Sequence, residues 1–173
     1  LLSEQTALQT QITTDYPEYA ALRYPHPVAL DTLQQEVLQP GELIIIASRP
    51  SMGKTALAIE AAWKLAPENT PPASFPDGII FYSFYGQPAV DPAFDHLVRS
   101  YEDDPQDTSP AGVFRLLSNK QALIILDGAE EADDLPAVFR CCGGCGVLIT
   151  TRDRSDAHGT LVSIGRVGAI TLS

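Results

Sequence analysis

The sequence has few cysteines, no long hydrophobic run and no cluster of basic residues. Its longest strongly apolar runs, such as Leu43–Ala47 and Leu123–Leu126, are far shorter than the roughly 20 residues that span a bilayer. No basic and apolar signal segment opens the chain. With 45% hydrophobic and 19% charged residues, the composition is typical of a folded domain. We therefore expect a cytoplasmic protein without a membrane partner.

Basic residues are outnumbered two to one, with 11 Lys and Arg against 22 Asp and Glu and a net charge of −11. Nucleic-acid backbones attract clustered Lys and Arg, and the sequence contains no such cluster. The acidic residues concentrate in two runs, Glu102–Asp107 and Glu130–Asp134, of which the first is most simply explained as solvated surface. We therefore expect no nucleic-acid partner.

The three cysteines, Cys141, Cys142 and Cys145, lie close together. The last two have the C-x-x-C spacing, but no second pair and no neighbouring His completes a zinc site. A redox role requires a nucleophilic Cys at a helix N-terminus, whereas these residues follow a predicted helix. They are interpreted as reduced thiols in a glycine-rich turn.

Apolar strands alternate with amphipathic helices, which is typical of an α/β fold with a parallel sheet covered on both faces. The predicted strands are Leu43–Ala47, Gly78–Phe84, Ala122–Leu126, Gly146–Thr151, and a fifth from Leu161–Ile164 and Val167–Leu172. The predicted helices are Asp31–Leu38, Lys54–Ala66, Asp91–Tyr101, Pro110–Leu117 and Asp133–Arg140. We expect residues 1–29 to form an irregular lead-in and residues 30–173 to form one P-loop domain.

The segment Ser48–Thr55 lies between a predicted strand and a predicted helix, the context in which the pattern G-x-x-x-x-G-K-[ST] binds phosphate. Gly53 lets backbone N–H groups approach the phosphates, and the positive end of the following helix points at the same place. Lys54 supplies a charge for the β- and γ-phosphates, and the Thr55 hydroxyl is placed to ligate Mg²⁺. Ser48 stands where the pattern expects Gly. The residues expected to bind the nucleotide are Arg49, Pro50, Ser51, Met52, Gly53, Lys54, Thr55, Ala56, Asp127 and Arg152.

Acidic residues follow the strand that ends at Asp127. The carboxyl edge of a parallel sheet displays functional residues, and a carboxylate there suits Mg²⁺ opposite Thr55. Glu130 or Glu131 is positioned to orient or deprotonate the attacking water. Of these two, Glu130 is the preferred catalytic candidate, and the catalytic set is completed by Lys54 and Arg152.

Arg152 follows the next strand, on the same edge of the sheet. An Arg at that place can donate charge-assisted hydrogen bonds to a γ-phosphate and so report its presence. The alternative is a surface Arg paired with Asp153 or Asp156.

Three segments, Ile45–Leu57, Leu123–Glu131 and Val147–Asp153, together resemble the STAND class of P-loop NTPases, which contains the NB-ARC and NACHT signalling ATPases. Asp127-Gly128 followed by two glutamates looks like the NACHT variant, and Thr150-Thr151-Arg152 looks like the NB-ARC sensor motif. The resemblance implies a three-layer P-loop fold with a five-stranded parallel sheet of order 5-1-4-3-2.

The same resemblance implies a function and partners. It implies ATP/ADP and Mg²⁺ as cofactors, slow ATP hydrolysis, and a nucleotide-controlled switch that self-associates through this domain. A protein or ligand trigger is then sensed by other domains. Because the chain starts at Leu1 and ends at Ser173 just after a strand-like stretch, we expect it to be a fragment, with the helical and winged-helix subdomains of the family beyond it.

A second resemblance is confined to the phosphate loop. Leu38–Ala58, and above all Arg49–Thr55, is similar to the P-loop region of RecA-like replicative helicases. Downstream this likeness fails, because the strand ending at Asp127 runs into Gly-Ala-Glu-Glu and no DNA-binding patch is evident. The sequence therefore favours a signalling ATPase first and a helicase-type motor second.

Overall fold

The computed structural model describes residues 40–41, 43–47, 53–66, 71–152, 160–164 and 170–172, the last two ranges as strands without their side chains. The predicted lead-in, the predicted helix Asp31–Leu38 and the loop residues 48–52 lie outside the described residues. None of the described helices is long and apolar enough to cross a membrane.

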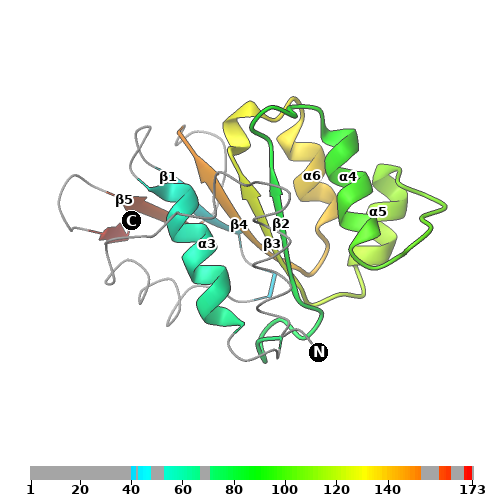
Figure 1. Cartoon of the computed structure of the whole chain (residues 1–173), viewed down its shortest axis with the longest axis horizontal. Helices are drawn as coiled ribbons and strands as arrows, with labels where there is room; N and C mark the ends of the chain where they lie inside the picture. The colour runs from blue at the N-terminus through cyan, green and yellow to red at the C-terminus, as the bar shows by residue number, and fades with distance from the viewer. Residues whose placement is uncertain are drawn as a thin grey trace.

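Helices and strands alternate along the described chain (Figure 1). The elements are, in order, β1 (Leu43–Ala47), α3 (Lys54–Leu65), β2 (Ile79–Ser83), α4 (Val90–Arg99), α5 (Pro110–Leu117), β3 (Leu123–Asp127), the 3₁₀ turn η4 (Ala129–Glu131), α6 (Leu135–Cys141), β4 (Gly146–Thr151), β5 (Thr160–Ile164) and β6 (Ile170–Leu172). The strands form one sheet of order β2-β3-β4-β1-β5-β6.

The predicted parallel α/β sheet with the partial order 1-4-3-2 is confirmed, since β1 pairs with β4, β4 with β3 and β3 with β2, all in parallel. The predicted count of five strands is corrected to six. Strand β5 pairs with β1 in parallel, and β6 pairs with β5 antiparallel. Thr160–Ile164 and Ile170–Leu172 are therefore two strands of opposite direction rather than the two parts of one strand.

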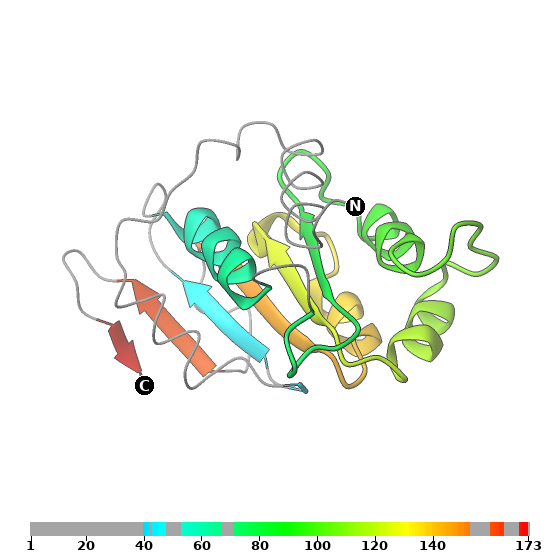
Figure 2. The same cartoon turned by 60° about the horizontal axis from the view of Figure 1, so that its bottom comes forward.

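The core lies on both faces of the sheet, because alternate residues of a strand point to opposite sides. On one face, Ile44 and Ile46 of β1 pack in a cluster with α3. On the other face, Ile45 and Ala47 belong to a cluster that includes α4, α5 and α6. The three-layer arrangement is therefore present: among the described helices, α3 lies on one face of the sheet, and α4, α5 and α6 lie on the other (Figure 1, Figure 2).

The helix boundaries follow from their capping groups. Helix α5 begins at Pro110 as predicted, because Ser109 accepts a hydrogen bond from the Gly112 N–H and Pro occupies the first helical position. Helix α6 begins two residues later than predicted, because the Asp134 carboxylate caps the Ala137 N–H. Strands β1 and β4 have the predicted bounds, which reflects the continuous apolar sequence of β1 and the β-branched residues of both strands.

Candidate phosphate and magnesium site

Asp127 is the centre of a hydrogen-bonded cluster at the carboxyl edge of the sheet. Its side chain is fully buried, and its Oδ1 accepts hydrogen bonds from the hydroxyls of Thr55 at 2.6 Å and Thr150 at 2.7 Å. Its Oδ2 accepts a third from the Ser83 hydroxyl at 3.3 Å. A buried carboxylate is costly unless it is hydrogen-bonded, and these three hydroxyls supply that compensation.

The first residues of α3 lie next to this carboxylate. Gly53 has φ = 78° in the left-handed region that favours glycine, so the chain turns sharply from the loop into the helix. Lys54 is buried, with 6% of its surface exposed. Burial lowers the pKa of Lys54, while the charges of Glu130 and Asp127 act in the opposite direction. The sheet edge thus combines a helix N-terminus, an ammonium group and a carboxylate.

The oxygen atoms of Thr55 and Asp127 fit a magnesium ion. Mg²⁺ is bound in P-loop proteins by one or two oxygen side chains together with phosphate and water. The 2.6 Å hydrogen bond shows that the Thr55 hydroxyl and Asp127 Oδ1 converge on one point. Among the described residues no group of three His, Cys, Asp or Glu could hold a metal by itself. In the described part of the chain the donors that meet here are one carboxylate and one hydroxyl, a set that suits an Mg²⁺ ion completed by phosphate and water.

Ser83 and Thr150 belong to the site but are absent from the sequence-based set. Ser83 pairs with Asp127 across β2 and β3, and the Thr150 hydroxyl also accepts a hydrogen bond from the Gly128 N–H at 3.0 Å. The sequence does contain a signal for Ser83 and Thr150 as site residues, because each is a polar residue at the end of an apolar strand. Their contact with Asp127 depends on the strand register, which the sequence does not specify.

Arg152 is held by the two glutamates of η4. Its backbone N–H and its Nε donate to Glu130, at 3.1 Å and 2.5 Å, and its Nη2 donates to Glu131. Burial alone would raise the pKa of Glu130, but hydrogen bonds from its own backbone and from Arg152 lower it. The predicted alternative pairings with Asp153 and Asp156 lie outside the described residues, whereas the observed partners are Glu130 and Glu131.

Tyr85 covers the turn between Asp127 and η4. Its hydroxyl donates to Glu130 Oε1 at 3.2 Å, and its side chain is 41% exposed. Gly128 has φ = 68°, and a Cβ at this position would lie 2.9 Å from the Tyr85 ring. A small residue after the carboxylate is therefore required by backbone conformation and by space. Tyr85 is a further residue of this site that no motif in the sequence indicates.

The structure thus brings together most of the predicted site residues that it describes. Gly53, Lys54 and Thr55 lie at the start of α3 beside Asp127, and Glu130 and Arg152 are joined to each other. Ala56 is buried in the first turn of α3. Arg49, Pro50, Ser51 and Met52 lie outside the described residues, so their expected contacts with nucleotide stay predictions.

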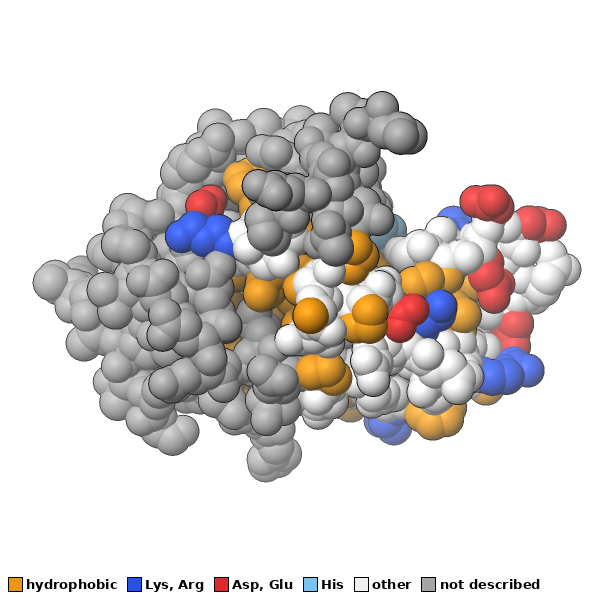
Figure 3. All heavy atoms as spheres, turned by 90° about the horizontal axis from the view of Figure 1, so that it is seen from below, with side chains coloured by type: hydrophobic (Ala, Val, Ile, Leu, Met, Phe, Trp, Pro, Cys, Tyr) orange, Lys and Arg blue, Asp and Glu red, His pale blue; other side chains and the backbone are white. Residues whose placement is uncertain are grey.

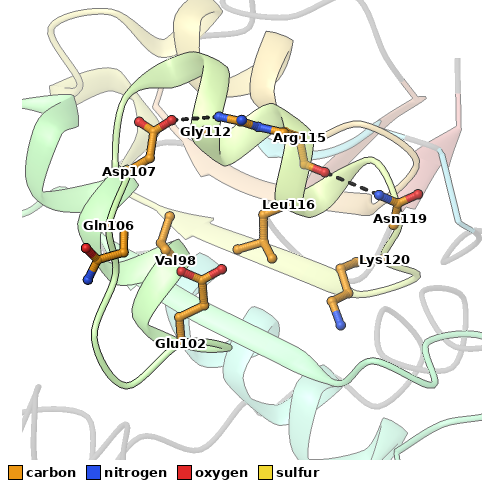
Figure 4. A pocket seen from close by; sticks show the side chains of 9 residues that line it. All are labelled: Val98, Glu102, Gln106, Asp107, Gly112, Arg115, Leu116, Asn119 and Lys120. Carbon is orange, nitrogen blue, oxygen red and sulfur yellow. Dashed lines mark hydrogen bonds and ion pairs between the residues drawn. The ribbon is translucent and has the colours of Figure 1, made fainter.

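A groove of about 530 Å³ lies apart from these residues, along α4 and α5 (Figure 4). Its lining residues are Val98, Glu102, Gln106, Asp107, Gly112, Arg115, Leu116, Asn119 and Lys120. Across its rim, Arg115 pairs with Asp107 at 2.7 Å. Figure 3 shows acidic side chains, with basic ones among them, at this end of the molecule. The first acidic run is therefore mostly exposed surface, as predicted.

The three cysteines are free thiols inside the core. Cys141 ends α6, and burial raises the pKa of all three thiols. The Sγ of Cys142 donates to the Val138 carbonyl at 3.2 Å. Because the reactive form of cysteine is the thiolate, these residues act as small apolar side chains.

Comparisons with known proteins give a family match over part of the chain and several solved structures of similar fold. Residues 28–84, about a third of the chain, match the family described as DnaB-like helicase C terminal domain. No curated protein matches the chain. The chain is similar to Cdc6p from Pyrobaculum aerophilum, with a TM-score of 0.52 and 15% identity over 82% of this chain and 43% of that one. It is also similar to Drosophila ORC bound to DNA, with a TM-score of 0.55 and 12% identity over 88% of this chain and 44% of that one.

The described chain has an α/β fold with a mostly parallel sheet, similar to that of these two solved structures. It spans less than half the length of the two solved structures to which it is similar. The finer resemblance to the STAND class has no counterpart in these comparisons. The expected absence of a nucleic-acid partner is not supported either, because one of the similar structures is bound to DNA.

Proposed function

We propose that this chain binds ATP and ADP together with Mg²⁺ and hydrolyses ATP. The observation that carries the proposal is the 2.6 Å hydrogen bond between Thr55 and Asp127. It joins the first turn of α3 to the end of β3, next to the buried Lys54. This is the arrangement of hydroxyl, carboxylate and ammonium that phosphoryl transfer requires.

Each residue has a separate task in this proposal. Lys54 binds the β- and γ-phosphates, and the N–H groups at the start of α3 face the same anion. Thr55 and Asp127 hold Mg²⁺, which neutralises charge on the phosphates when it is bound. Glu130, whose side chain is 10% exposed, orients or deprotonates the attacking water. Arg152 contacts the γ-phosphate.

Thr55→Val is expected to remove most of the magnesium dependence of ATP binding. The substitution keeps the shape of the side chain but removes the hydroxyl that donates to Asp127. We expect ATP affinity in Mg²⁺ to fall about tenfold, the equivalent of one charge-assisted hydrogen bond, with little change in EDTA. Calorimetric titration in both buffers measures this, and Thr108→Val in the α4–α5 loop is the matched control. Equal losses in Mg²⁺ and EDTA would contradict the assigned role.

The proposed ATP hydrolysis serves either a motor or a switch, and one observation favours a helicase-type motor. The match to the DnaB-like family begins before β1 and includes β1, α3 and β2. It therefore covers the P-loop unit as a whole. We propose a RecA-like ATPase motor as the first role, and a STAND-type nucleotide switch, supported by the motifs around Asp127 and Arg152, as the second. This reverses the order given by the sequence alone.

Single-stranded DNA is expected to accelerate ATP hydrolysis severalfold if the motor role holds. Because the chain carries a net charge of −11, it repels the DNA phosphates overall, and we expect this stimulation to be weakest at low salt, where the repulsion is least screened. Phosphate-release kinetics with and without DNA measure it, and light scattering in ATP or ADP measures the molecular mass. No effect of DNA, together with assembly only in ATP, would reverse the two roles.

A further inference from the structure

Arg152, the residue proposed to sense the γ-phosphate, is already paired with two carboxylates. One guanidinium faces two carboxylates, with Nε on Glu130 at 2.5 Å and Nη2 on Glu131. The group of three side chains therefore carries a net charge of about −1 at neutral pH. The same cation that is expected to attract a phosphate is neutralised by its own neighbours.

Glu130 and Glu131 differ in their exposure and in the number of groups that donate hydrogen bonds to them. The Glu130 side chain is 10% exposed and accepts further hydrogen bonds from the Arg152 N–H and the Tyr85 hydroxyl. The Glu131 side chain is 42% exposed, and Arg152 is its partner in the ion pair described. Glu130 is thus fixed by several groups, whereas the contact of Glu131 with Arg152 is exchangeable with solvent.

We propose that Glu131 sets the selectivity of this site between ATP and ADP by competing with the γ-phosphate for the Arg152 guanidinium. The inference rests on the proposed function. ADP lacks the phosphate that would reach Arg152, so the competition lowers the affinity for ATP and leaves that for ADP nearly unchanged. Glu131 is in this sense a residue that determines specificity, and it acts only through Arg152.

The test is the ratio of two dissociation constants, that of ADP over that of a β,γ-imido ATP analogue, both measured with Mg²⁺ by calorimetry. Exposed ion pairs contribute up to about 1 kcal/mol. E131Q is therefore expected to raise the ratio about twofold to fivefold. Glu60→Gln in α3 removes the same charge without breaking a described contact of Arg152, and is expected to leave the ratio unchanged.

A double-mutant cycle separates this competition from a general charge effect. In an Arg152→Ala background, E131Q is expected to have no effect on the ratio, because the guanidinium over which the two anions compete is gone. A rise that persists in this background would overturn the proposal. An unchanged or lower ratio for E131Q in the native background would overturn it as well, since Glu131 would then position Arg152 rather than compete for it. If the native chain binds neither nucleotide, the proposed function itself fails.

Discussion

Replacing Glu130 with glutamine is expected to lower the rate of ATP hydrolysis by about 100-fold to 10,000-fold and to leave ATP binding nearly intact. A positioned general base contributes an acceleration of this size. Glutamine retains an oxygen that can accept the hydrogen bonds of Arg152 and Tyr85, but it cannot accept a proton from water. The substitution therefore removes the chemistry and preserves the two contacts of Oε1, while the hydrogen bond that Oε2 accepts from the Arg152 N–H is lost.

Single-turnover hydrolysis with protein in excess over ATP is the appropriate measurement, because we expect the native rate of this chain to be slow. Glu60→Gln is the matched control, since it removes a carboxylate from α3 outside the cluster around Asp127. Calorimetric titration of the same proteins reports binding. Loss of binding in Glu130→Gln, or hydrolysis at the native rate, would remove Glu130 from the catalytic role.

Lys54→Ala is expected to weaken the binding of both ATP and ADP by about 10-fold to 100-fold. Hydrogen bonds to a charged group contribute about 1.5–3 kcal/mol, and Lys54 is buried where solvent screening is weak. Since its ammonium is expected to contact the β- as well as the γ-phosphate, ADP is affected along with ATP. This distinguishes Lys54 from Arg152, whose removal is expected to weaken ATP more than ADP.

Lys64→Ala is the matched control for this second prediction, because Lys64 is an exposed residue in the last turn of the same helix. Thermal unfolding of both variants is measured alongside binding, since the buried stem of Lys54 also contributes to packing. Native affinity in a folded Lys54→Ala protein would place the phosphate elsewhere in the molecule.

The secondary structure and the phosphate site could be predicted wherever they depend on residues that are close together in the sequence. The apolar sequence of Leu43–Ala47 and the apolar, β-branched sequence of Val147–Thr151 after Gly146 match β1 and β4 residue for residue. Gly53-Lys54-Thr55 is a local motif, so its place at the start of α3 follows from the sequence. Asp127 was found because a carboxylate that ends a buried strand lies at the functional edge of a parallel sheet.

Helix boundaries and the far edge of the sheet were less predictable. The start of α6 depends on which of several acidic residues caps it, and Asp134 does so rather than Asp133. The antiparallel strand β6 follows β5 in the chain, and the apolar sequence of either strand is compatible with both directions.

The sequence by itself determined the order of the local features. A strand, a phosphate loop and a helix come first, and a strand that ends in an acidic residue follows. Only the tertiary structure decided how the side chains meet. Ser83 and Thr150 reach Asp127 through strand register, and Arg152 finds Glu130 and Glu131 across 21 or more residues of chain. Contacts of this kind depend on how separate strands align and on the space left between them, as Tyr85 over Gly128 illustrates.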